Sequence, residues 1–119
     1  REKANQSEVM NIIGNVEGKT CILLDDIVDT AGSLCGAAKA IKEIGGAKEV
    51  YACATHGVLS GPALERIENS CIEEVVVTDA VPVPLERQTG KIKVLTLAPL
   101  FAQTIDVVYN NGSIGKLFE

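Results

Sequence analysis

The sequence predicts an α/β fold, in three layers, with a mainly parallel sheet and helices on both faces. Short apolar runs of strand length alternate with segments whose apolar residues recur at helical spacing. The apolar residues are mostly Val, Ile, Leu and Ala, because the chain has no Trp, two Tyr and two Phe. That composition suits buried parallel strands covered by helices. A length of 119 residues is sufficient for one domain with its own core.

The first half of the chain predicts two strands and a helix. Residues 9–13 form a short β-prone run, and residues 14–19 supply turn residues after it. Residues 21–24 are a continuous apolar run, which predicts a buried strand that ends at Asp25 and Asp26. An amphipathic helix follows and stops at Gly45-Gly46. Its apolar residues are Leu34, Ala37, Ala38, Ile41 and Ile44.

The second half continues the alternation. Residues 50–55, 75–77 and 92–97 predict buried strands, and residues 62–68 predict a helix with Pro62 at its start. Residues 99–109 predict a last helix with Leu100, Ile105 and Val108 facing inward, and residues 81–90 a loop. This order predicts right-handed crossovers between parallel strands.

Charge and hydropathy exclude two classes of partner. The net charge is -5, and the eleven Lys and Arg are scattered, so nucleic-acid binding is not expected. No apolar run is long enough for a membrane span, and no signal-peptide stretch follows the first residues. We expect a cytoplasmic protein. Because the chain opens on Arg1 rather than Met, we expect it to be a piece of something longer.

We assign no metal site or disulfide to the cysteines, and no nucleotide-binding P-loop to the lysine-containing turn. The four cysteines are far apart and there is one His, so no zinc ligand set is predicted. We expect reduced thiols in the core without disulfides. Gly18-Lys19-Thr20 is similar to the end of a P-loop, but the spacing of the glycines is wrong and a strand follows, which indicates a turn.

The chemistry is expected where the first buried strand leads into the helix, at residues 25–33. Ligands of open α/β sheets bind beyond the carboxyl ends of strands. Asp25, Asp26 and Asp29 would repel one another and raise some of their pKa values unless a cation, sugar hydroxyls or N–H groups compensate them. This segment therefore predicts a bound polyol or magnesium.

The residues that open the helix predict a phosphate site. Backbone N–H groups of Thr30, Ala31, Gly32 and Ser33 can hold a phosphate with the helix dipole and two hydroxyls. Gly32 would let the phosphate approach the backbone closely. The alternative is that Asp29 or Thr30 only caps the helix and that the other two carboxylates are solvated turn residues.

His56 follows a predicted strand and is expected on the same rim as the acidic loop. We assign it a supporting role, and direct contact with the substrate is left open.

Residues 24–34, Leu-Asp-Asp-Ile-Val-Asp-Thr-Ala-Gly-Ser-Leu, resemble the phosphoribosyl pyrophosphate loop of the type I phosphoribosyltransferase fold. Further segments narrow the resemblance. They are Ala4-Asn5 with residues 9–14, residues 54–57 with 59–63, residues 75–78, and Ser113-Ile114 with Leu117-Phe118. Together they resemble the C-terminal half of ribose-phosphate pyrophosphokinases along essentially all 119 residues.

The resemblance implies an enzyme that transfers the pyrophosphoryl group of ATP to ribose 5-phosphate, giving phosphoribosyl pyrophosphate and AMP. It implies that Asp29 and residues 30–33 grip the 5-phosphate, and that Asp25 and Asp26 hold the ribose hydroxyls with Mg²⁺ nearby. Arg1 resembles the Arg of a mobile basic loop whose catalytic Lys lies two residues earlier, before this chain. The ATP base pocket and a metal-binding His of the family belong to the N-terminal half.

On this basis residues 1–119 are expected to form a single C-terminal ribose-5-phosphate-binding domain of a larger two-domain enzyme, which in the family assembles as a hexamer. Ser33 stands where Thr is usual, which keeps the hydroxyl. Ser113 and Phe118 fall near the family's regulatory nucleotide site, but Gly115 stands where a second Ser is common, which puts that regulation in doubt.

Two alternatives remain open. The acidic loop and phosphate nest are shared with phosphoribosyltransferases and with regulators that sense phosphoribosyl pyrophosphate. A non-catalytic subunit that modulates a true synthetase would also keep this fold.

Overall fold

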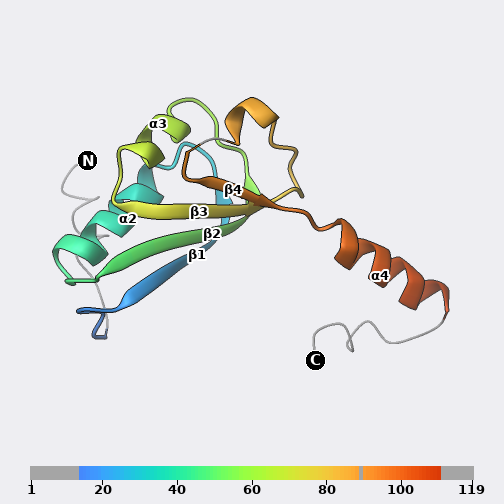
Figure 1. The fold of residues 1–119 in the computed structure, drawn as a ribbon, viewed down its shortest axis with the longest axis horizontal. Coiled ribbons are helices and arrows are strands. Elements are labelled where there is room, and N and C mark those ends of the chain that lie inside the picture. Colours follow the sequence, from blue (N-terminus) through green and yellow to red (C-terminus); the bar gives the residue numbers. More distant parts are fainter. Residues whose placement is uncertain (1–13, 89, 111–119) are drawn as a thin grey trace.

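A parallel sheet organises the protein. The computed structural model describes residues 14–88 and 90–110. Its four strands lie in the order β1-β2-β3-β4, and every neighbouring pair is parallel (Figure 1). The strands are β1 (Thr20–Val28), β2 (Glu49–Gly57), β3 (Ile72–Thr78) and β4 (Ile92–Leu95). The predicted α/β class and parallel sheet are confirmed. The strand predicted at residues 9–13 lies outside the described residues.

Two helices cover the sheet. Helix α2 (Gly32–Glu43) contacts β1 and β2, and α3 (Ala63–Glu68) contacts β3 and α2. The predicted loop at residues 81–90 contains one 3-10 turn, η1 (Leu85–Arg87), and the last helix is α4 (Ala98–Tyr109). The expected alternation of strands and helices is thus present.

The core lies between the sheet and these two helices. Alternate residues of a strand point to one face, so Val50, Ala52 and Ala54 of β2 are buried together. From the helix side, Leu34 and Ala38 of α2 join the same cluster. The strands and the helix predicted from the sequence therefore meet at one interface, to which the sheet contributes mainly Val and Ala.

Glycines end α2 as predicted. Gly46 adopts a φ of 77°, and its N–H donates to the Lys42 carbonyl at 3.2 Å. The Ala47 N–H donates to the Ile41 carbonyl at 3.2 Å, so the chain reverses at once. The Gly18 N–H in turn donates to the Gly46 carbonyl at 2.9 Å. Because β1 follows directly, the lysine-containing segment is a turn and not a P-loop.

Helices on both faces were predicted, and for the described residues this is wrong. The face of the sheet opposite α2 and α3 carries exposed apolar side chains: Ile22 is 61%, Leu24 82% and Leu95 61% exposed. The strand order gives the reason. Parallel crossovers are right-handed, so connections that all advance in the same direction place their helices on the same face.

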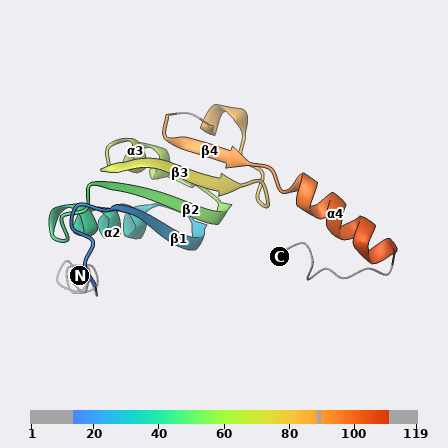
Figure 2. The same cartoon turned by 60° about the horizontal axis from the view of Figure 1, so that its bottom comes forward.

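The inward-facing residues predicted for the last helix are also not packed. Helix α4 extends away from the sheet in both views (Figures 1 and 2). Ile105 is 69% and Val108 57% exposed, and Leu100 is half-buried. Their spacing correctly predicted an amphipathic helix, but no described segment supplies the surface that its apolar stripe would cover.

The four cysteines are free thiols, but each is half-buried and none belongs to the buried core that was predicted for them. Burial raises the pKa of the Cys35 thiol, which keeps it protonated at neutral pH. Among the described helices, none has the length and apolar character needed to cross a membrane.

Candidate ligand site at the end of strand β1

Asp25 and Asp26 lie inside β1 and not beyond its end. The strand was predicted to stop at residue 24, but its pairing with β2 continues through Asp25 opposite Ala54 and Val28 opposite Gly57. Both carboxylates are exposed there, whereas Val28 at the end of the same strand is buried in the core. The connection to α2 is therefore reduced to Asp29, Thr30 and Ala31.

The connection carries free hydrogen-bond donors. Ala31 adopts a left-handed conformation, with φ 66° and ψ 10°, which is uncommon for a residue other than glycine. Within residues 14–88 and 90–110, no side chain caps α2, and the N–H groups of Gly32 and Ser33 have no acceptor. The alternative in which Asp29 or Thr30 caps this helix is therefore not supported. The geometry can accept an anion at the positive end of the helix dipole.

A neighbouring loop holds Asp29 in place. The Ser60 hydroxyl donates to Asp29 Oδ1, and the Ser60 N–H donates to the Asp29 carbonyl at 3.0 Å. The N–H groups of Val58 and Leu59 both donate to the Val28 carbonyl, at 3.0 and 3.1 Å. Ser60 was part of the resemblance, but no role was predicted for it, since 31 residues separate it from Asp29.

A second residue that the sequence did not indicate is Arg66 of α3. Its Nη1 donates to the Thr30 carbonyl at 3.2 Å. A Cβ atom added to Gly32 would lie 3.1 Å from the same nitrogen. Gly32 was predicted to allow a close approach of phosphate. The structure adds that a side chain there would meet the Arg66 guanidinium.

One of the compensating contacts that the prediction required, a backbone N–H group, is present at Asp25. A hydrogen bond with the Asp26 side chain, and then the Asp26 N–H at 2.7 Å from Asp25 Oδ1, lower the pKa of Asp25. These hydrogen bonds favour the charged form of Asp25. Among the described residues, no group of three His, Cys, Asp or Glu side chains is arranged to hold a metal ion.

His56 lies on the expected rim. It pairs with Ile27 at the end of β1 and forms an isolated bridge with Asp79 on its other side. Its Nδ1 is buried and has no hydrogen-bond partner among the described residues. The shared rim is confirmed, and its supporting role stays a prediction.

Comparison with known proteins assigns the family. The model of the phosphoribosyl synthetase-associated domain matches residues 2–119. The chain belongs to the phosphoribosyl synthetase-associated domain family.

Two similar proteins share one name, and a similar solved structure carries another. The chain is 58% identical to the ribose-phosphate pyrophosphokinase of Caldanaerobacter subterraneus over 118 residues, which is 99% of this chain and 37% of that protein. It is 56% identical to the ribose-phosphate pyrophosphokinase of Oceanobacillus iheyensis over 119 residues, again 37% of that protein. The crystal structure of phosphoribosylpyrophosphate synthetase from Mycobacterium smegmatis superposes with a TM-score of 0.78 and 46% identity, covering 84% of this chain and 33% of that one.

This phosphoribosyl synthetase-associated domain thus spans about a third of the length of the relatives it matches. The expectation of a C-terminal half is not confirmed: half is too large a share, and the matched length by itself assigns the chain to neither end. Arg1, Ser113 and Phe118 lie outside the described residues, so their expected catalytic and regulatory roles stay predictions.

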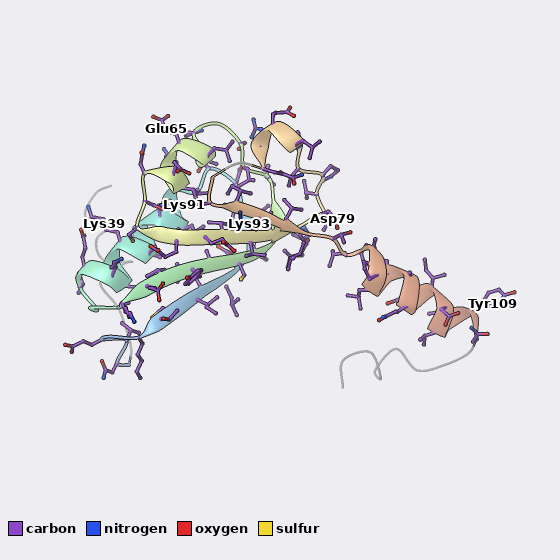
Figure 3. The ribbon with its side chains drawn as sticks, in the orientation of Figure 1. Lys39, Glu65, Asp79, Lys91, Lys93 and Tyr109 are labelled. Atoms are coloured by element: carbon purple, nitrogen blue, oxygen red, sulfur yellow. The ribbon has the colours of Figure 1, made fainter. Side chains whose placement is uncertain are left out.

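Asp79 follows β3 and contacts the segment between β4 and α4 (Figure 3). A hydrogen bond with the Thr96 side chain, and then the Leu97 N–H at 2.7 Å, lower the pKa of Asp79 below its ordinary value of 3.8. The hydrogen bonds that the ionised Asp79 carboxylate accepts stabilise the folded state. Because its folded-state pKa is lowered, this stabilisation is present above pH 3.8 and is lost as the pH falls through the folded-state pKa.

We therefore expect an NMR titration of the Asp79 carboxyl to have its midpoint below 3.8. In Asp79→Ala, hydrogen exchange of the Leu97 amide should accelerate by about tenfold, the equivalent of one lost charge-assisted hydrogen bond. Asp79→Asn, which keeps an acceptor, is the control and should exchange at an intermediate rate. Equal exchange in all three proteins would show that this contact does not fasten α4.

Proposed function

We propose that this chain is the ribose-5-phosphate-binding part of a synthetase that transfers the pyrophosphoryl group of ATP to ribose 5-phosphate, giving phosphoribosyl pyrophosphate and AMP. The observation that carries the proposal is the start of α2. Gly32 and Ser33 present unpaired N–H groups directly after three carboxylates. Hydrogen-bond donors suited to a phosphate therefore lie next to hydrogen-bond acceptors suited to sugar hydroxyls.

In this proposal residues 29–33 grip the 5-phosphate, and Asp25 and Asp26 accept hydrogen bonds from the ribose hydroxyls. The name of the two relatives compared above, ribose-phosphate pyrophosphokinase, supports this choice of substrate. The chain has a net charge of -5, but backbone N–H groups can bind a phosphate without any Lys or Arg side chain. Because the fold holds these groups in place, they need not rearrange when the phosphate binds.

Magnesium fits the same place in part. Asp25 and Asp26 are exposed carboxylates, and Mg²⁺ is commonly bound through one or two carboxylates, several waters and substrate phosphates. We propose that these two residues hold the ion when substrates are bound. It would neutralise charge on the transferred group. Further ligands would come from the substrates and the rest of the parent protein.

ATP binding and chemistry would depend on that remainder, since the chain spans 37% of its relatives. We propose that Arg1 belongs to a basic loop over the ATP phosphates and that the complete enzyme is a hexamer. Sequencing the parent gene on both sides of the 119 residues would decide where in the protein this segment stands.

A non-catalytic subunit is the second candidate, because the matching family is described as synthetase-associated. The purified parent protein, given ATP, Mg²⁺ and ribose 5-phosphate, discriminates the two. A synthetase releases AMP and phosphoribosyl pyrophosphate in equal amounts. A modulating subunit releases neither alone and changes the rate of an active synthetase. A phosphoribosyltransferase would instead require pyrophosphate and a nucleobase.

The isolated 119-residue chain is expected to bind ribose 5-phosphate weakly and to have no synthase activity. The catalytic Lys that the resemblance implies, and most of the parent protein, are not in it. The measurement is AMP release by the chain and by the parent at equal concentration. AMP release by the chain at a rate close to the parent's would show that the active site has been misassigned.

A further inference from the structure

A side chain of another helix contacts residues 29–33, the segment proposed to bind the 5-phosphate. Arg66 lies in the last turn of α3, 36 residues beyond Thr30, and its Nη1 reaches the Thr30 carbonyl at 3.2 Å. Its guanidinium also lines the groove between α2 and α3, where it stays in contact with water. Because water solvates the guanidinium, its positive charge needs no buried carboxylate as a partner.

The contact determines where one amide points. In a trans peptide the C=O and N–H bonds are antiparallel and lie in one plane. A carbonyl of Thr30 directed at Arg66 therefore directs the N–H of Ala31 away from Arg66. Ala31 is also the residue that adopts the left-handed conformation, with a φ of 66° and 5% exposure. Such a conformation persists where neighbouring contacts stabilise it.

Gly32 and Arg66 are spatially matched. The added Cβ of any other residue at position 32 would stand 3.1 Å from Arg66 Nη1, which is closer than most carbon contacts. The guanidinium would have to shift by a few tenths of an ångström, which would weaken its hydrogen bond to the Thr30 carbonyl. A glycine at position 32 thus leaves the Arg66 guanidinium undisturbed, in addition to leaving room for a ligand.

We propose that Arg66 is a positioning residue for the 5-phosphate: it orients the Thr30–Ala31 peptide so that the Ala31 N–H faces the bound phosphate. This inference rests on the proposed function, and it concerns a residue that acts through the backbone and does not touch the substrate.

Kinetics of the full-length parent protein provide the first test. We expect Arg66→Met to raise the KM for ribose 5-phosphate by about tenfold, the worth of one charge-assisted hydrogen bond, while kcat and the KM for ATP change by less than about twofold. Arg66→Lys should recover part of the loss, because the lysine ammonium group can still donate a hydrogen bond to the Thr30 carbonyl but lacks the planar, preorganised guanidinium. Lys39→Met removes the same charge from α2 (Figure 3) and should stay within about twofold of wild type.

A double-mutant cycle tests the mechanism. Gly32→Ala should raise the KM for ribose 5-phosphate in the wild-type protein but add less than about twofold in Arg66→Met, since the side chain that it displaces is already gone. Additive effects, or an unchanged KM in Arg66→Met, would overturn the positioning role.

A ligand-free measurement separates this inference from the proposed function. The three-bond coupling between the amide and Hα protons of Ala31 reports its φ angle. We expect the left-handed value in wild type and Lys39→Met, and its loss in Arg66→Met. If ribose 5-phosphate fails to bind wild type, the proposed function fails, and so does the positioning of a phosphate. If ribose 5-phosphate binds and Ala31 is unchanged in Arg66→Met, the inference alone fails.

Discussion

Replacement of Gly57 by alanine is expected to destabilise the sheet by about 3 kcal/mol, at the upper end of the usual cost of overpacking a core. Gly57 is the last residue of β2, and an added Cβ would lie 2.8 Å from Val77 Cγ2 and 2.9 Å from both Val77 Cβ and Cγ1. Real Cβ atoms do not approach this closely. Val77 is 0% exposed, so it has no space into which to retreat, and the two strands must separate.

Urea unfolding of the 119-residue chain measures this effect. Val77→Ala removes both methyl groups that meet the added carbon. The double variant Gly57→Ala/Val77→Ala should therefore be more stable than the sum of the two single losses. Val77 Cβ remains 2.9 Å away, so the recovery should be partial. Thr55→Val places a branched side chain at an exposed position of the same strand and is the control. Strict additivity would contradict the predicted clash.

Gly32→Val is expected to lower the affinity for ribose 5-phosphate by about a hundredfold or more without unfolding the protein. A branched side chain at this position displaces Arg66 and crowds the N–H groups that open α2. A hundredfold loss corresponds to about 2.7 kcal/mol, which is the worth of one to two charge-assisted hydrogen bonds. Calorimetric titration with ribose 5-phosphate gives the affinity, and circular dichroism gives the fold.

Lys39→Val is the matched control, because it puts the same branched residue into the same helix at an exposed position. Its affinity should stay within about twofold of wild type. If Gly32→Val bound ribose 5-phosphate as tightly as wild type, the start of α2 would not be part of the binding site.

Local patterns predicted the elements well. Residues 50–55 were predicted as a buried strand and lie within β2. The helical spacing of Leu34, Ala38 and Ile41 corresponds to α2, and Gly46 follows its end. These features depend on neighbours close in sequence, which periodicity reports directly. The end of β1 was placed four residues early, because Asp25 and Asp26 look like turn residues but their backbones still pair with β2.

Contacts between distant segments could not be predicted in the same way. The Ser60 hydroxyl on Asp29 and the Arg66 guanidinium on the Thr30 carbonyl join residues 31 and 36 positions apart, and no spacing rule announces them. The candidate site residues were predicted because charged and small residues cluster in one short run. The residues that hold them in place carry no such signal.

The uncovered side of the sheet was missed for a topological reason. A composition rich in Val and Ile indicates strands buried on both faces, and this led to the expectation of two helical layers. The order β1-β2-β3-β4 sends every crossover to one side. Amphipathicity predicted α4 itself, but it could not predict which surface the helix would cover.

The position of β1 at the margin of the described sheet has a consequence for regulation. Within residues 14–88 and 90–110, β1 is hydrogen-bonded to β2 on one side only, and the same nine-residue strand leads directly into the ligand loop. Any segment that docked along its other side would stiffen the strand and, through it, the loop. By reciprocity, a ligand that orders the loop would favour that docking to the same degree.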